Sequence, residues 1–494
     1  MWYMSTRDKT VRVSAAEAIA QGLASDGGLF VPEVLPRFTE DQIESLCEMT
    51  YQERAVYLMG FFLRDFSFPE LAEFVEQAYN EKTFDAPEIA PLVECAEDTW
   101  FLELWHGPTS AFKDMALQIL PYLLTASLEK TKEEREVCIL VATSGDTGKA
   151  ALEGFCDVPR TKILVFYPKD GVSDVQALQM QTQAGDNVGV LSVVGNFDDA
   201  QTGVKRIFGD AALAKELNDR GYFLSSANSI NWGRLLPQIV YYVSAYCDLI
   251  RAERIEVGER VNFSVPTGNF GNILAGFYAK QMGLPIGKLI CASNANNVLT
   301  EFIRTGVYNR NRPFHTTLSP SMDILVSSNL ERLLFLLSGG NDTETAGYMK
   351  ELSEKGQYTV SPEVRAAVAE TFWADFCDDA RTRERIAELF EAGYLMDTHT
   401  AVAYDVLEKY RAETGDTTPT VVVSTASPYK FADSVLDALG ALGDAEGLAL
   451  IDKLSEVSGT TAPEPLVALR GKEVRFDRTV EAEEMTAAVR AFLV

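Results

Sequence analysis

Long apolar runs, paired cysteines and histidines are all scarce in this sequence. No apolar stretch approaches the roughly 20 residues that a membrane-spanning helix needs. The opening MWYMSTRDKT lacks the apolar core of a signal peptide. The seven cysteines lie far apart without a CxxC pair, and the chain has three histidines. We therefore expect a cytoplasmic protein with reduced thiols, no membrane partner and no metal centre built from cysteine or histidine.

Positive charge is scarce as well. The chain has 44 lysines and arginines against 72 aspartates and glutamates, so its formal net charge is −28. A surface of this sign repels nucleic acid and anionic lipids, which argues against both as partners. An anionic small molecule would have to be held locally, by individual basic side chains and by the N-termini of helices.

The length of 494 residues exceeds what a single hydrophobic core usually supports, so we expect more than one domain. Residues 1–98 predict a mainly helical N-terminal domain, residues 99–440 an α/β region, and residues 441–494 a C-terminal extension. In the first domain, helices are expected at residues 14–21, 40–49 and 70–79, and a turn at 26–32 leads into a short extended segment.

From about residue 100 onward, apolar segments rich in β-branched residues alternate with helical patterns. Strands without a polar face, alternating with helices, indicate parallel sheets covered on both sides, and hence an α/β fold. Residues 321–395 are helical and rich in charge, which is typical of an insertion. The tail predicts an extended segment at 472–476 and a helix at 482–492. The expected strands cover residues 137–143, 162–167, 188–194, 261–265, 288–293 and 419–425.

One lysine lies near the start of an expected helix whose other faces are apolar. In the motif HGPTSAFKD at residues 106–114, Thr109 is expected to cap a helix that begins close to Ser110. Lys113 follows Phe112 near the end of the helix where the backbone dipole opposes a cation. It is either an ordinary solvated lysine, which is the commoner case, or a lysine of lowered pKa that forms a Schiff base with a carbonyl.

Three strand-to-helix loops have compositions suited to binding anions, and ligands of open α/β sheets sit at such loops. The first, TSGDTG at residues 143–148, presents hydroxyls and backbone N–H groups before a helix expected to start at Lys149. It is not a P-loop, because Thr143 replaces the first glycine of that motif and Ala150 replaces its serine or threonine. An ordinary capped turn is the competing interpretation.

The other two loops follow later strands. GNFGN at residues 268–272 lets the backbone approach a ligand closely, as a phosphate monoester requires, although tight turns also use glycine. Residues 225–234 place small polar side chains and Arg234 at a helix start, where an arginine needs an anion, either a ligand or a surface carboxylate. A lysine that accepts an aldehyde, combined with several anion-binding loops, suggests pyridoxal phosphate chemistry.

Taken together, these motifs resemble the threonine synthase family, in the long form with an extra N-terminal domain that many bacteria and fungi have. The resemblance is carried by HGPTSAFKD (106–114), ATSGDTG (142–148), SANSINWGR (226–234) and VPTGNFGN (265–272). Three further segments fit, namely DGGLFVP (26–32), MDILVSSNLER (322–332) and HTAVAY (399–404). Each motif alone is moderately specific, but the ordered set is highly specific and extends from about residue 10 to about residue 435.

The resemblance implies fold type II of the pyridoxal phosphate enzymes, similar to tryptophan synthase β, with two parallel-sheet subdomains. It implies pyridoxal 5'-phosphate as cofactor, Lys113 as the Schiff-base lysine, Asp146 near the ring hydroxyl and Thr425 at the pyridine nitrogen. The cofactor phosphate would be held by Gly268, Asn269, Phe270, Gly271 and Asn272. The substrate carboxylate would bind Thr143, Ser144 and Thr147, and the substrate phosphate would bind Asn228, Ser229 and Arg234.

The implied reaction converts O-phospho-L-homoserine and water to L-threonine and phosphate, in a monomer or a homodimer. Two alternatives remain open: a phospholyase on the same scaffold that yields phosphate and a 2-keto acid, and a catalytically silent binding protein. Lys113 and the phosphate loop favour an enzyme, because a silent protein has no physical need of them. Many members of the family have a histidine where this chain has Ser427, so no role is assigned to that side chain.

Overall fold

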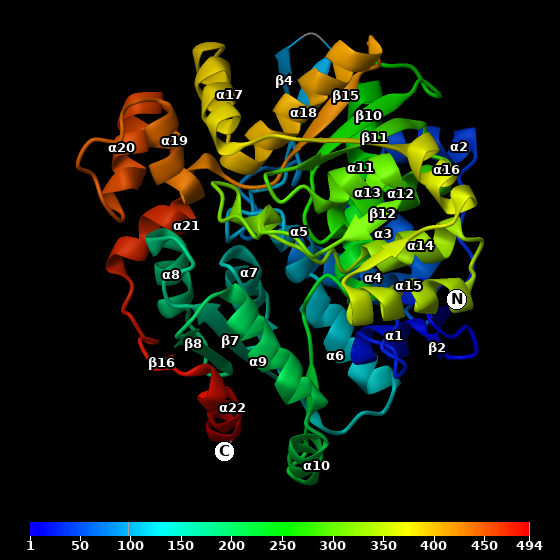
Figure 1. The fold of residues 1–494 in the computed structure, drawn as a ribbon, viewed down its shortest axis with the longest axis vertical. Helices are drawn as coiled ribbons and strands as arrows, with labels where there is room; N and C mark the ends of the chain where they lie inside the picture. Colours follow the sequence, from blue (N-terminus) through cyan, green and yellow to red (C-terminus); the bar gives the residue numbers. More distant parts are fainter. Residues whose placement is uncertain (97, 494) are drawn as a thin grey trace.

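The computed structural model describes residues 1–96 and 98–493 and arranges them around two mainly parallel sheets with helices on their faces (Figure 1). The α/β fold with two such sheets, expected from the sequence, is confirmed. The N-terminal region adds helices and a small antiparallel sheet. No helix among the described residues combines the length and the apolar character that crossing a bilayer requires.

Each of the four helices in the N-terminal region begins at a serine or threonine whose hydroxyl accepts the N–H of the third helical residue. The helices expected at 14–21, 40–49 and 70–79 are confirmed. The short extended segment expected at the end of residues 26–32 is confirmed as β3, whereas α3, β1 and β2 are not predicted, since strands this short show no period. The elements are β1 (Trp2–Ser5), β2 (Arg12–Ser14), α1 (Ala15–Gln21), β3 (Phe30–Pro32), α2 (Glu40–Cys47), α3 (Tyr51–Phe62) and α4 (Phe68–Ala78).

The larger sheet has six strands in the order β14-β11-β10-β15-β5-β4, and only the pair β4–β5 is antiparallel. The strands expected at 261–265, 288–293 and 419–425 are confirmed as β10, β11 and β15. The segment 321–395, expected as a helical insertion, also supplies the edge strand β14. The strands are β4 (Leu92–Ala96), β5 (Thr99–Glu103), β10 (Val261–Pro266), β11 (Ile286–Ser293), β14 (Phe372–Phe376) and β15 (Thr420–Ser424).

The smaller sheet has five strands, all parallel, in the order β16-β8-β7-β6-β9. The strands expected at 137–143, 162–167 and 188–194 are confirmed as β6, β7 and β8. The prediction of an extended segment at 472–476 is wrong, because the strand of the tail that pairs with β8 is β16, which comes later in the chain. The strands are β6 (Glu136–Ala142), β7 (Thr161–Pro168), β8 (Val188–Val193), β9 (Tyr222–Ser225) and β16 (Thr479–Val480).

Helix α11 (Trp232–Arg251) is buried on nearly all sides, as expected of a helix at the centre of a large core. It contacts helices of the N-terminal region and α12 of the α/β region, so it ties the two together. The other helices of the smaller sheet and its surroundings are α7 (Asp146–Gly154), α8 (Asp174–Gln181), α9 (Phe197–Gly209), α10 (Ala211–Asp219) and α22 (Met485–Phe492). Those around the larger sheet are α12 (Gly271–Gln281), α13 (Val298–Thr305), α14 (Leu330–Leu337), α15 (Asp342–Lys355), α16 (Pro362–Thr371), α17 (Asp379–Glu391), α18 (Thr398–Thr414), α19 (Ala432–Ala438), α20 (Ala449–Ser458) and α21 (Glu464–Val467).

The helix that should follow the HGPTSAFKD motif begins later than expected. A short helix, α5 (Asp114–Leu117), precedes α6 (Leu120–Lys130), and Ser110 adopts a left-handed φ of 57° instead of starting a helix. Ala111 pairs with Ala426 in an antiparallel bridge. These contacts hold the backbone before Lys113 against the end of β15, which prevents an earlier helix start.

Candidate active site

A cavity of about 290 Å³ opens where loops at the carboxyl ends of β6, β10 and β15 meet. All three loops that the sequence marks as anion sites contribute to its lining. Lys113 and Thr425 line it as well, so every expected site residue except Asp146 borders one cavity, and Asp146 contacts Lys113. A larger groove of about 690 Å³ lies against α3 and α4, but no lysine, arginine or histidine is among its described lining residues. The smaller cavity is therefore the candidate site for anions.

Lys113 faces this cavity rather than bulk solvent, and its side chain is 11% exposed. Its Nζ donates to Ser321 Oγ at 3.3 Å and lies 3.7 Å from Asp146 Oδ2. Burial lowers the pKa of Lys113, the Asp146 carboxylate opposes that shift, and two nearby cations, Lys430 and Arg234, reinforce it. Of the two interpretations open from the sequence, the structure supports the buried lysine of lowered pKa.

Asp146 is a buried carboxylate at the start of α7, with cations on two sides. Its Oδ1 accepts Gln176 Nε2 at 2.9 Å and lies 2.8 Å from Lys430 Nζ. Burial alone would raise the pKa of Asp146, but Lys430 and Lys113 outweigh burial and hold the pKa well below its usual range. Asp146 is predicted from the sequence, but Lys430 is not, because it comes from a distant segment of the chain.

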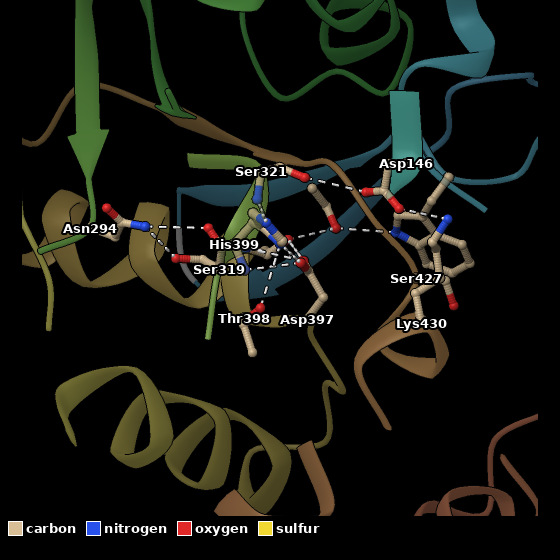
Figure 2. A network of polar contacts seen from close by, with 12 residues as sticks. Asp146, Asn294, Ser319, Ser321, Asp397, Thr398, His399, Ser427 and Lys430 are labelled. Carbon is tan, nitrogen blue, oxygen red and sulfur yellow. Dashed lines mark hydrogen bonds and ion pairs between the residues drawn. The ribbon is translucent and has the colours of Figure 1, made fainter. Parts of the chain in front are cut away.

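A second polar network reaches the cavity from α18 (Figure 2). His399 Nε2 accepts the backbone N–H of Ser321 at 3.2 Å, so its ring proton belongs on Nδ1, which donates to Asp397 at 2.7 Å. Asp397 also caps α18 by accepting the N–H groups of His399 and Thr400. The network fixes the loop that carries Ser321, whose hydroxyl bridges Lys113 and Asp146. Sequence reasoning misses Ser321 and finds no partner for His399.

The first anion loop is shaped by its own side chains. Thr143 Oγ1 accepts the N–H groups of Gly145 at 3.0 Å and Gly148 at 2.9 Å, while Gly145 adopts a φ of 132°. A Cβ at Gly145 would lie 2.5 Å from the Gln176 side chain, so the turn requires glycine here. Helix α7 starts at Asp146 and not at Lys149 as expected, because the loop closes earlier. The first turn of α7 therefore borders the cavity, through Thr147.

The GNFGN loop turns through a left-handed residue, Phe270, with a φ of 65°, directly before α12. Asn272 Oδ1 accepts the hydroxyls of Tyr241 at 2.8 Å and Tyr242 at 2.7 Å, which fixes the orientation of its amide. The Nδ2 of Asn272 is buried and has no hydrogen-bond partner among the described residues. A Cβ at Gly268 would lie 2.7 Å from the carbonyl oxygen of Ser321. The loop therefore presents backbone without a side chain at Gly268 and an amide donor without a partner at Asn272.

Arg234 lies near the start of α11 and is buried. Its guanidinium donates to the carbonyl of Ala227, while its Nε has no partner among the described residues. Burial lowers the pKa of Arg234 to about 10. The surface-carboxylate interpretation is wrong, since no ion pair with Arg234 forms within the described chain. A buried cation without a counterion is costly and indicates an anionic ligand. Asn228 and Ser229 line the cavity beside it.

Thr425 and Ser427 follow β15 but face different surroundings. Thr425 lines the cavity, and its carbonyl accepts the N–H of Phe112 at 2.8 Å, which places it beside Lys113. Ser427 is buried and caps the short 3₁₀ helix η2 (Pro428–Phe431), where its hydroxyl accepts the N–H of Tyr429 at 3.4 Å. The serine that replaces the family's histidine therefore serves the local fold.

The side chains present match what pyridoxal phosphate needs. A buried amine at Lys113 faces a cavity that also holds an unpaired amide donor at Asn272 and a bare backbone at Gly268. These groups suit an aldehyde with a phosphate tail. Among the described residues, no group of three or more side chains is arranged to hold a metal ion.

Comparison with known proteins agrees with this site. A family profile described as "Pyridoxal-phosphate dependent enzyme" matches residues 78–372. Two further profiles, "Threonine synthase N terminus" and "Threonine synthase, C-terminal", match residues 2–79 and 400–492. Fold and site thus define a pyridoxal-phosphate-dependent enzyme of fold type II.

Individual relatives narrow this class further. The threonine synthase of Pseudomonas aeruginosa is 41% identical to this chain, and the alignment covers 88% of this chain and 90% of the P. aeruginosa protein. The crystal structure of PLP-bound threonine synthase from Brucella melitensis has a TM-score of 0.88 and 37% identity, covering 100% of this chain and 99% of that chain. The chain belongs to the threonine synthase family. Human threonine synthase-like 1 is also 41% identical, but the chain spans 60% of its length.

Proposed function

We propose that this protein is a pyridoxal-phosphate-dependent threonine synthase, which converts O-phospho-L-homoserine and water to L-threonine and phosphate. The observation that carries the proposal is the buried amine of Lys113 in a cavity that also presents unpaired donors for two anions. One donor set would bind the cofactor phosphate and the other the substrate phosphate. The similarity to the P. aeruginosa enzyme over most of both chains supports the same reaction.

The cofactor, when bound, supplies an electron sink for negative charge at the substrate α-carbon. Lys113 would hold its aldehyde carbon, and residues 268–272 would hold its phosphate through backbone N–H groups and the free amide of Asn272. Asp146 would lie at the ring hydroxyl and Thr425 at the pyridine nitrogen. Both are close to Lys113 in the structure, which supports these roles.

Lys113 would also carry protons at the substrate carbons. A proton carrier must change its charge readily, and the lowered pKa of the buried amine favours this. Ser321 Oγ, 3.3 Å from both Lys113 Nζ and Asp146 Oδ2, orients the amine toward the cavity.

The substrate carries two anionic groups, and we assign a different part of the cavity lining to each. The carboxylate would bind at the start of α7, through Thr143, Ser144 and Thr147, in a loop whose shape is held by the N–H groups of Gly145 and Gly148 donating to Thr143 Oγ1. The phosphate would bind Arg234 together with Asn228 and Ser229. Because the whole protein has a net charge of −28, this local positive charge has to overcome a repulsive field.

A phospholyase and a silent binding protein are the competing functions, and product analysis separates them. Purified protein, loaded with pyridoxal phosphate and given O-phospho-L-homoserine, should release phosphate and threonine in equal amounts. Phosphate with 2-oxobutyrate instead of threonine would indicate a phospholyase, and no phosphate would indicate a silent protein. Lys113→Ala should abolish phosphate release and serves as the control.

The location in the cell and the oligomeric state also belong to the proposal. All seven cysteines are free thiols in the structure, which supports the reducing environment of the cytoplasm. A monomer or a homodimer is expected, with O-phospho-L-homoserine as its small-molecule partner and neither nucleic acid nor membrane as a partner.

A further inference from the structure

Lys430 is a fully buried lysine beside the cavity that does not itself line it. It lies in η2, directly after β15, and its side chain is 0% exposed. Its Nζ lies 2.8 Å from Asp146 Oδ1 and donates to the carbonyl of Thr109 at 2.8 Å. Figure 2 shows its Nζ directed toward the Asp146 carboxylate. Neither the motifs nor the proposed mechanism gives this residue a task.

The two oxygens of Asp146 serve different partners. Oδ1 has the short contacts, with Lys430 at 2.8 Å and Gln176 at 2.9 Å. Oδ2 has the long ones, with Ser321 at 3.3 Å and Lys113 at 3.7 Å. The carboxylate is therefore neutralised mainly by Lys430, and Lys113 is its weaker neighbour.

This asymmetry matters for the reactivity of Lys113. A buried carboxylate with a single lysine beside it favours the charged ammonium, which cannot attack an aldehyde. A second cation removes that effect, because it compensates the carboxylate and repels a further positive charge. Arg234 adds to the repulsion. The other charged or titratable groups facing this cluster are Asp114 on α5 and, through Ser321, His399 and Asp397 at the start of α18.

We propose that Lys430 is a positioning residue: by pairing with Asp146 it leaves the Lys113 amine more nucleophilic than it would be beside an uncompensated carboxylate. The inference rests on the proposed function only in taking Lys113 as the amine that binds the cofactor. Lys430 itself is excluded from that role, since its Nζ is held by two oxygens and has no access to the cavity.

The test measures how the reactivity of Lys113 depends on pH in the full-length, cofactor-free chain. Competitive acetylation with acetic anhydride, read by mass spectrometry of the Lys113 peptide, gives the midpoint of its protonation. Lys430→Met should move this midpoint upward by about one pH unit, and so lower the reactivity of Lys113 at pH 7 about tenfold. An unchanged midpoint would overturn the proposal.

Two further variants separate a charge effect from a folding defect. Lys149 is a different buried lysine, in α7, and it pairs with Glu153 at 2.6 Å rather than with Asp146. Lys149→Met should therefore leave the Lys113 midpoint unchanged. Asp146→Asn combined with Lys430→Met removes both charges and should return the midpoint close to that of the wild type. A double variant that behaves like Lys430→Met alone would contradict the proposal.

The remaining outcomes are decisive as well. If Lys430→Met does not fold, Asp146→Asn alone should still lower the Lys113 midpoint, because the carboxylate 3.7 Å from Lys113 is gone while Lys430 stays. A raised or unchanged midpoint in that variant would overturn the proposal. Acetylation does not depend on threonine formation, so a shifted midpoint in a protein that makes no threonine would refute the proposed function and leave this inference standing.

Discussion

His106 lies between two carboxylates at the end of β5. Its Nδ1 is 2.5 Å from Asp85 Oδ1 and its Nε2 is 3.0 Å from Glu103 Oε2. Burial lowers its pKa, but the hydrogen bonds to Asp85 and Glu103 outweigh burial and raise the pKa of His106 to about 9. The charged ring therefore stabilises the folded state below pH 6.5, and this contribution is lost as pH rises through about 9.

His106→Gln should reveal this dependence in urea unfolding. The free energy of unfolding should fall by about 1–2 kcal/mol at pH 6, after allowance for solvent screening at Asp85. The difference between variant and wild type should shrink to near zero above pH 9. A difference that grows with pH would contradict the assigned ion pairs.

For single residues, the sequence predicts the members of the motifs better than it predicts the side chains that contact them. The candidates from Lys113 to Thr425 border or contact one cavity, because each lies in a motif marked either by its own composition or by the family resemblance. Ser321 and Lys430 are missed. Their roles depend on contacts with Asp146 from distant segments, and no local pattern encodes such contacts.

The GNFGN loop tests the account at the scale of an element. A Cβ at Gly268 would lie 2.7 Å from the Ser321 carbonyl oxygen, and a backbone atom cannot easily yield. Gly268→Ala should therefore lower the affinity for pyridoxal phosphate at least tenfold, measured by absorbance titration, while the fold is retained.

Gly347→Ala in α15 is the matched control. A Cβ there meets no atom within 4 Å, so cofactor affinity should not change. Stability should rise by about 0.5–1 kcal/mol, because alanine favours a helix over glycine. Equal affinity in Gly268→Ala and wild type would mean that this loop does not hold the cofactor phosphate.

Among the elements, the apolar runs predict six strands of the α/β region, and all six are present. The strands β5, β9 and β14 are not predicted, although β5 lies inside the larger sheet and all of its residues are buried. The late start of α5 is not predicted either, because Ala111 is paired with Ala426 rather than being helical.

For the whole molecule, the relation between the two sheets is what the sequence leaves open. Alternating strand and helix patterns predict parallel sheets, and the family resemblance implies two of them, but neither predicts that their loops share one cavity. Helix α11 packs against α12 beside the larger sheet and against α5, and α5 in turn contacts α7 beside the smaller sheet. The motifs supply the chemical groups, and this packing brings them together.

The most direct test of the whole account is to trap the lysine that binds the cofactor. Protein loaded with pyridoxal phosphate is reduced with borohydride, digested and mapped by mass spectrometry. The account predicts a pyridoxyl group on Lys113 and none in Lys113→Ala. A label on another lysine, or no label in the folded wild-type protein, would contradict it.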